Sequence, residues 1–169
     1  MTAANALTLF RAVAVIPIVW AIAADQRFLA LGLFVLAAAS DALDGVLARR
    51  AGKSSPRGAL LDPLADKVLV LGTLGALTAV GTGWPVTVVT AATAMREGVV
   101  ALLRVRAFGR GVALPADRLA KAKTAAQMIG VGMVIVGERP WPVAGATLVG
   151  LALLLGLVTL PRYFVARLT

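Results

Sequence analysis

The sequence predicts an all-α integral membrane protein of six transmembrane helices, with a polar cavity at its cytoplasmic side. Of the 169 residues, 60% are apolar and only 15% are charged, a balance that is unusual for a soluble domain. Six apolar stretches follow one another, and a helix needs about 20 mostly apolar residues to cross a hydrocarbon core. Connections rich in basic residues also alternate with connections that have few of them. Six spans use up nearly all of the chain, so we expect a single membrane domain over residues 1–169.

Each expected span is an apolar stretch bounded by charged or Gly/Pro-containing turns. The spans are 5–24, 28–48, 60–80, 84–103, 124–136 and 141–160. The fifth is the shortest, and it reaches full length only if it includes Lys121 and Lys123, whose long side chains can extend to the interface.

The basic residues predict the orientation. They concentrate in the second and fourth connections and at the C-terminus, whereas the odd-numbered connections hold only Arg27 and Arg139, each beside an acid. By the positive-inside rule, both termini and the even connections face the cytoplasm, as expected for a multi-pass protein of the cytoplasmic (inner) membrane. The net charge of +9 favours anionic lipid headgroups as partners. With 5% aromatic residues the chain offers little base stacking, so we expect no nucleic-acid partner.

One alternative is that the first stretch is a cleaved signal peptide, because Ala21-Ile22-Ala23 has the small-residue spacing of a cleavage site. However, Arg11 is the only charge before the apolar core. Cleavage would also leave five spans, and the charge alternation would then be harder to explain.

Four of the eight acids, Asp41, Asp44, Asp62 and Asp66, fall at the end of the second span and the start of the third. On helices, one arc of about 100° holds Asp41, Asp44, Gly45 and Ala48, while Gly58, Asp62 and Asp66 form an i, i+4, i+8 stripe. Four carboxylates near a membrane boundary need compensation for desolvation and mutual repulsion. Because the chain has no His or Cys, this oxygen-only set points to Mg²⁺ or Mn²⁺, and four carboxylates are enough to hold two ions.

Two simpler explanations exist for these acids. They could be helix caps, since Asp62 before Pro63 resembles a helix start. They could also form an interfacial acidic belt that Arg49, Arg50 and Lys67 neutralise. Neither a cap nor a belt requires the acids to share one face.

The acids belong to a longer pattern, D-x2-D-G-x2-A-R-x8-G-x3-D-x3-D, with eight fixed positions over 26 residues. Its members are Asp41, Asp44, Gly45, Ala48, Arg49, Gly58, Asp62 and Asp66. This pattern resembles, without a gap or substitution, the signature of the CDP-alcohol phosphotransferase family. The resemblance implies a six-helix membrane enzyme, often a homodimer, that transfers a phosphatidyl or similar group from a CDP-linked donor to an alcohol and releases CMP.

The resemblance also implies roles for these residues. Asp41, Asp44 and Asp62 would be metal ligands, and Asp66 would be both a ligand and the catalytic base for the acceptor hydroxyl. Gly45, Ala48, Arg49 and Gly58 would bind CDP, because small residues let a nucleotide approach the backbone and Arg49 offers several donors to a diphosphate. For Gly45 alone, close helix packing is the simpler explanation.

Segments outside the signature resemble the branch of the family that joins CDP-diacylglycerol to glycerol 3-phosphate. They are residues 5–11, 61–67, 96–97 and 123–127. Ala4 and Ala120 depart from the pattern of that branch. Alternative acceptors are phosphatidylglycerol, as in cardiolipin synthesis, and inositol phosphate.

Polar residues in the cytoplasmic third of the spans are further candidates, because buried charge in a membrane usually marks a functional cavity. We expect Asn5 and Thr8 to belong to the CDP site. We expect Arg96, Arg118, Lys121 and Lys123 to bind the anionic acceptor. The alternatives are that Arg11 extends to the interface, that Arg96 and Glu97 support the helix bundle, and that the other basic residues attract headgroups.

A different class of protein, a small ion or proton-coupled transporter, could use the four acids as a relay. It would need polar residues across the bilayer midplane. Nearly all ionisable groups here are instead confined to the cytoplasmic third, and the chain has no internal repeat of the transporter kind.

Overall fold

The computed structural model describes residues 3–51, 56–108 and 118–158, and side-chain surroundings for residues 11–40, 67–103, 106 and 122–158. The described residues form helices joined by short turns, without strands. The helices are α1 (Ala3–Ala23), α2 (Arg27–Ala51), α3 (Pro56–Ala79), α4 (Trp84–Phe108), α5 (Arg118–Val136) and α6 (Trp141–Val158). The expected all-α fold with six helices is therefore confirmed for this part of the chain.

Several helices extend beyond the apolar spans expected from the sequence. α4 continues from residue 103 to Phe108, and α5 begins at Arg118, so it includes Lys121 and Lys123. Apolar composition indicates where a helix can lie in hydrocarbon, whereas backbone hydrogen bonds continue the helix into the charged flanks. α3 begins at Pro56, six residues before Asp62, so the interpretation of Asp62 as a helix cap is wrong.

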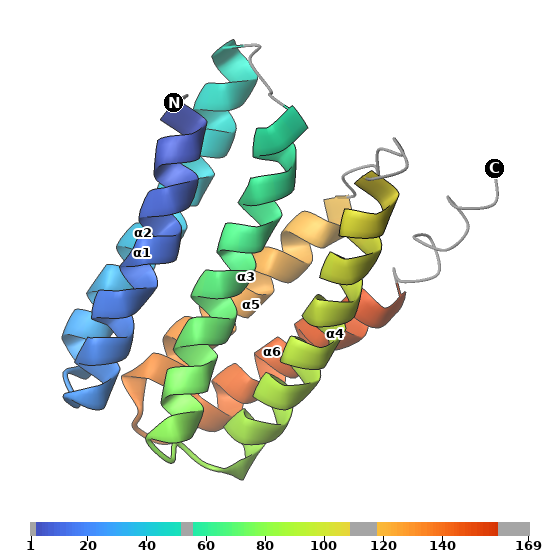
Figure 1. Cartoon of the computed structure of the whole chain (residues 1–169). Helices are drawn as coiled ribbons and strands as arrows, with labels where there is room; N and C mark the ends of the chain where they lie inside the picture. Colours follow the sequence, from blue (N-terminus) through green and yellow to red (C-terminus); the bar gives the residue numbers. More distant parts are fainter. Residues whose placement is uncertain (1–2, 52–55, 109–117, 159–169) are drawn as a thin grey trace.

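The helices run alternately up and down the bundle (Figure 1). The α1–α2, α3–α4 and α5–α6 connections lie at one end, and the end of α2, the start of α3, the end of α4 and the start of α5 lie at the other. α1 packs against both α2 and α3, α5 packs against α2, α3 and α6, and α4 packs against α3 and α6. This arrangement places the signature residues of α2 and α3 at the same end as the basic start of α5.

α1 is an integral part of this bundle. Its side chains Ile18, Ala21 and Ile22 are fully buried and pack in one apolar core with Phe34 of α2 and Leu69 of α3. This is the packing expected of a retained span, and it weighs against the signal-peptide alternative.

α5 and α6 cross at a pair of glycines, Gly130 and Gly145. A Cβ atom placed on Gly130 would lie 2.8 Å from the Gly145 carbonyl oxygen, and one on Gly145 would lie 2.5 Å from the Gly130 carbonyl oxygen. Only glycine allows the two backbones to approach this closely, as is common where helices pack in membranes.

The outer surface of the bundle carries many large apolar side chains, among them Ile16, Leu36, Met95, Ile129 and Leu154. Within the described residues, Trp84–Leu103 and Trp141–Val158 are long and apolar enough to cross a membrane, and α1, α2, α3 and α5 contain shorter apolar stretches. Trp20, Phe28, Trp84 and Trp141 are exposed, and all lie near the end that holds the odd-numbered connections. Exposed aromatic residues at one level are typical of a membrane interface.

Candidate functional site at the start of α3 and α5

The eight signature residues lie on two continuous helices. Asp41, Asp44, Gly45, Ala48 and Arg49 belong to α2, and Gly58, Asp62 and Asp66 belong to α3. The predicted stripe of Gly58, Asp62 and Asp66 requires a continuous helix over these residues, and α3 is helical from Pro56 to Ala79. The side chains of these residues lie outside the described ones, so their assignments as ligands, base and CDP site stay predictions.

The other predicted site residues fall on α1, α4 and α5. Asn5 and Thr8 lie on α1, and Arg118 and Lys121 lie in the first turns of α5, but their side chains are outside the described ones. Arg11 is 1% exposed, so its guanidinium lies inside the bundle and does not extend along the helix surface to the interface. A buried arginine on α1 is consistent with the expected polar interior, and it is not consistent with a side chain that extends to the membrane interface.

Glu97 of α4 gathers cations from three helices. Its Oε1 accepts from Lys123 Nζ of α5 and from Arg96 Nη1, and its Oε2 lies 3.2 Å from Lys67 Nζ of α3. Lys67 also donates to the Glu97 backbone carbonyl at 3.2 Å. The side chains of Arg96 and Glu97 are each 6% exposed. We call these four residues the Glu97 cluster.

The cluster is well suited to hold helices together. A buried charge is costly unless it is paired, and removing one partner of a buried pair costs about 3–5 kcal/mol. Three cations from α3, α4 and α5 meet one carboxylate here, so Glu97 ties these helices together. Lys67 directly follows Asp66, so the cluster lies at the level of the last signature aspartate.

Arg96 joins α4 to α6. Its Nη2 donates to the Gly156 carbonyl oxygen at 2.9 Å, while its Nη1 donates to Glu97. These contacts favour a role for Arg96 in supporting the helix bundle over the expected role in binding the acceptor.

Replacing Gly156 with alanine should disturb Arg96. A Cβ atom at this position would lie 2.9 Å from both Cζ and Nη2 of Arg96, whose guanidinium is fixed by Glu97. We expect Gly156→Ala to lower the free energy of unfolding by about 1–2 kcal/mol through overpacking, measured by thermal unfolding in detergent. Gly150→Ala is the matched control on the same helix, because its Cβ would meet only Val89 Cγ1 at 3.8 Å. Equal stability of the two variants would show that Arg96 moves freely.

The sequence did not predict that Lys67 contacts Glu97, or that Glu97 contacts cations of α3 and α5. The sequence suggests for Lys67 a place in a family-like segment and a role in neutralising an acidic belt, whereas the structure pairs it with Glu97, 30 residues later. Gln127 was seen only as part of a family-like segment. It lies one turn after Lys123, is buried, and its Nε2 has no hydrogen-bond partner among the described atoms.

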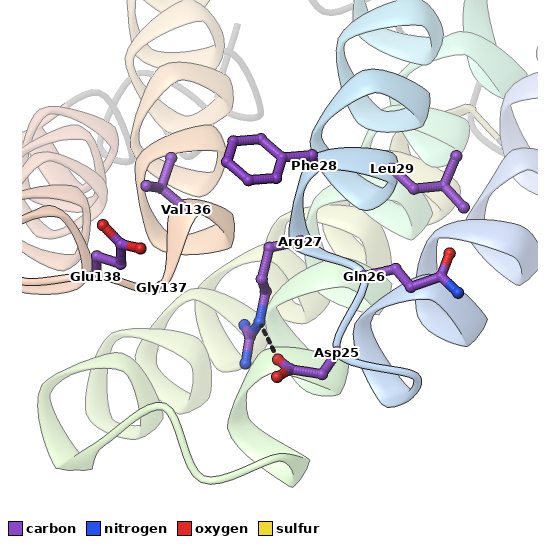
Figure 2. A pocket seen from close by; sticks show the side chains of 8 residues that line it. All are labelled: Asp25, Gln26, Arg27, Phe28, Leu29, Val136, Gly137 and Glu138. Atoms are coloured by element: carbon purple, nitrogen blue, oxygen red, sulfur yellow. Dashed lines mark hydrogen bonds and ion pairs between the residues drawn. The ribbon is translucent and has the colours of Figure 1, made fainter.

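A pocket of about 610 Å³ lies at the opposite end of the bundle, between the α1–α2 turn and the end of α5 (Figure 2). Its lining includes Phe28, Val136 and Glu138, together with Arg27, whose Nε is 2.9 Å from Asp25 Oδ1. Arg27 therefore pairs with the acid two residues before it. The pocket shares no residue with the signature or the Glu97 cluster.

The candidate metal ligands of this chain are the signature aspartates. Among the side chains that the structure describes there is no group of three or more potential Asp, Glu, His or Cys ligands. The chain contains neither His nor Cys. The signature aspartates belong to the second half of α2 and the first half of α3, and carboxylate oxygens are a donor set that suits Mg²⁺ or Mn²⁺.

Comparison with known proteins agrees with the signature. Residues 1–160 match the family model described as CDP-alcohol phosphatidyltransferase. A protein of Escherichia coli K12 named CDP-diacylglycerol–glycerol-3-phosphate 3-phosphatidyltransferase is 33% identical over 171 residues, which cover 95% of this chain and 91% of the relative. A Shigella flexneri protein of the same name is 33% identical over 145 residues, 80% of this chain and 77% of its own length. The resemblance inferred from the sequence is thus confirmed.

Proposed function

Since the chain belongs to the CDP-alcohol phosphatidyltransferase family, we propose that it transfers the phosphatidyl group of CDP-diacylglycerol to glycerol 3-phosphate, giving phosphatidylglycerophosphate and CMP. The observation that carries this proposal is the similarity, over 95% of the chain, to a relative named for that reaction. The segments at 5–11, 61–67, 96–97 and 123–127 support the same acceptor.

For the metal site we propose Asp41, Asp44, Asp62 and Asp66 as ligands of two Mg²⁺ or Mn²⁺ ions. When bound, the ions would supply charge that neutralises the diphosphate and the developing charge on the leaving group. Support comes from the oxygen-only donor set and from the continuous helices that carry these residues. The family also implies a homodimer, and we propose one here.

The chain's own groups then have distinct tasks. Asp66 takes the proton of the acceptor hydroxyl as that oxygen forms a bond to the phosphatidyl phosphorus, and the bond from phosphorus to the CMP oxygen breaks. Gly45, Ala48, Arg49 and Gly58, with Asn5 and Thr8 of α1, would hold the CDP moiety. No covalent enzyme intermediate is required.

Basic residues at the start of α5 would hold the phosphate of the acceptor. We propose Arg118, Lys121 and Lys123 for this role, with Arg96 as a weaker candidate because its described contacts go to Glu97 and Gly156. The concentration of basic residues in the first turns of α5 supports an anionic acceptor over an uncharged alcohol.

We further propose that all six helices cross the cytoplasmic membrane, with both termini and the active site facing the cytoplasm. The alternating charge, the exposed aromatic residues at one end and the apolar outer surface support this topology. Reporters fused or cysteines introduced near Lys53, Gly109 and Thr169 should therefore report the cytoplasm. Those near Asp25 and Gly83 should report the other side. The topology would be wrong if any of the first three were labelled from outside.

An assay of the purified protein tests the reaction and the acceptor together. The protein is supplied with Mg²⁺, CDP-diacylglycerol and, in parallel, glycerol 3-phosphate, phosphatidylglycerol or inositol phosphate, and CMP and the lipid product are followed. We expect CMP release with glycerol 3-phosphate. Turnover with only another alcohol would reject this acceptor and keep the reaction class, and no turnover with any alcohol would reject the proposed function.

A further inference from the structure

We propose that Glu97 is a positioning residue that holds the Lys123 ammonium group where it meets the phosphate of the acceptor. This inference rests on the proposed function, because it gives Glu97 a role in acceptor binding. Glu97 itself need not touch either substrate.

The first argument is the difference between the two lysines bound to Glu97. Lys67 contacts both the Glu97 carboxylate and the Glu97 backbone carbonyl, so it would keep a partner on α4 if the carboxylate lost its charge. The contacts described for Lys123 are with the Glu97 carboxylate. Loss of that charge should therefore release Lys123 while Lys67 stays attached to α4.

The second argument is the rigidity of Glu97. Its carboxylate is fixed by Arg96, which is itself anchored to the Gly156 carbonyl of α6, and by Lys67 of α3. Lys123 has a flexible side chain of four carbons, which loses much conformational freedom when it is held. A carboxylate anchored from two other helices can order that side chain before substrate arrives, and such ordering strengthens binding.

The third argument is where Lys123 lies. It is two residues after Lys121 and five after Arg118, in the basic first turns of α5. Lys67, bound to the same carboxylate, follows Asp66. Glu97 therefore links the helix that carries the proposed base to the helix that carries the proposed acceptor site. An error of about 1 Å in such an arrangement can reduce the rate about 100-fold.

The kinetic test uses Glu97→Gln, which keeps the shape of the side chain and removes its charge. We expect the KM for glycerol 3-phosphate to rise about 10- to 100-fold, with the KM for CDP-diacylglycerol changed less than about twofold. Lys123→Met should give a similar rise, and the double variant should show little further change. Glu97→Asp, which keeps the charge at a shorter reach, should show a smaller rise than Glu97→Gln. Glu138→Gln, at the opposite end of the bundle, is the control and should behave as the wild type.

A second measurement needs no turnover. In the full-length protein, labelling of Lys123 by an amine-reactive ester, measured by peptide mass spectrometry relative to Lys53, should increase severalfold in Glu97→Gln. An unchanged labelling ratio would overturn the proposal, as would equal rises in both KM values or additive effects in the double variant. If the wild type does not use glycerol 3-phosphate, the proposed acceptor fails, and the labelling ratio still decides whether Glu97 holds Lys123.

Discussion

Asp41→Asn and Asp44→Asn should each abolish turnover while the protein stays folded. An amide preserves the shape of the side chain but removes the negative charge that a hard divalent cation requires. Both residues lie in the second half of α2, on one continuous helix, and the chain has no His or Cys to replace a lost ligand. The measurement is CMP release from CDP-diacylglycerol with Mg²⁺, together with thermal unfolding to show that the variants are intact.

Asp25→Asn is the matched control for this pair. Asp25 is an exposed acid at the opposite end of the bundle, with a positive φ of 55° that asparagine also tolerates. Its replacement should leave turnover unchanged. Retained activity in either α2 variant, or full activity of the wild type in EDTA, would contradict the metal role.

Asp66→Asn should slow the chemical step by about 10²- to 10⁴-fold, the usual effect of losing a positioned base. Asp66 lies one helical turn after Asp62 on the stripe of α3, further from the helix start. CDP-diacylglycerol should still bind, because the base acts on the acceptor hydroxyl. Asp62→Asn should instead weaken metal and donor binding together.

Calorimetry for donor affinity and single-turnover kinetics for the chemical step separate these two roles. The expected result is a large kinetic loss in Asp66→Asn with donor affinity close to that of the wild type. Equal loss of donor binding in both variants would show that Asp66 acts mainly as a ligand and that another group is the base.

The helices and the family could be predicted from local patterns in the sequence. Apolar composition and turn residues located six helices, and the spans 84–103 and 141–160 begin at the same residues as α4 and α6. These signals are local, since a stretch of apolar residues needs no knowledge of its neighbours. The signature is likewise contained in 26 residues, so its eight positions could be recognised without a structure.

The pairing of charged side chains and the close contacts between backbones could not be predicted in this way, because they depend on how the helices pack. Lys67 and Glu97 are 30 residues apart, and Arg96 and Gly156 are 60 apart, so their pairing depends on which helices become neighbours. The burial of Arg11 and the close crossing at Gly130 and Gly145 depend on the same packing. A glycine in an apolar stretch indicates that another backbone approaches it closely, and a charged side chain there indicates that a polar partner lies nearby. The partner comes from another helix, and only the folded arrangement identifies it.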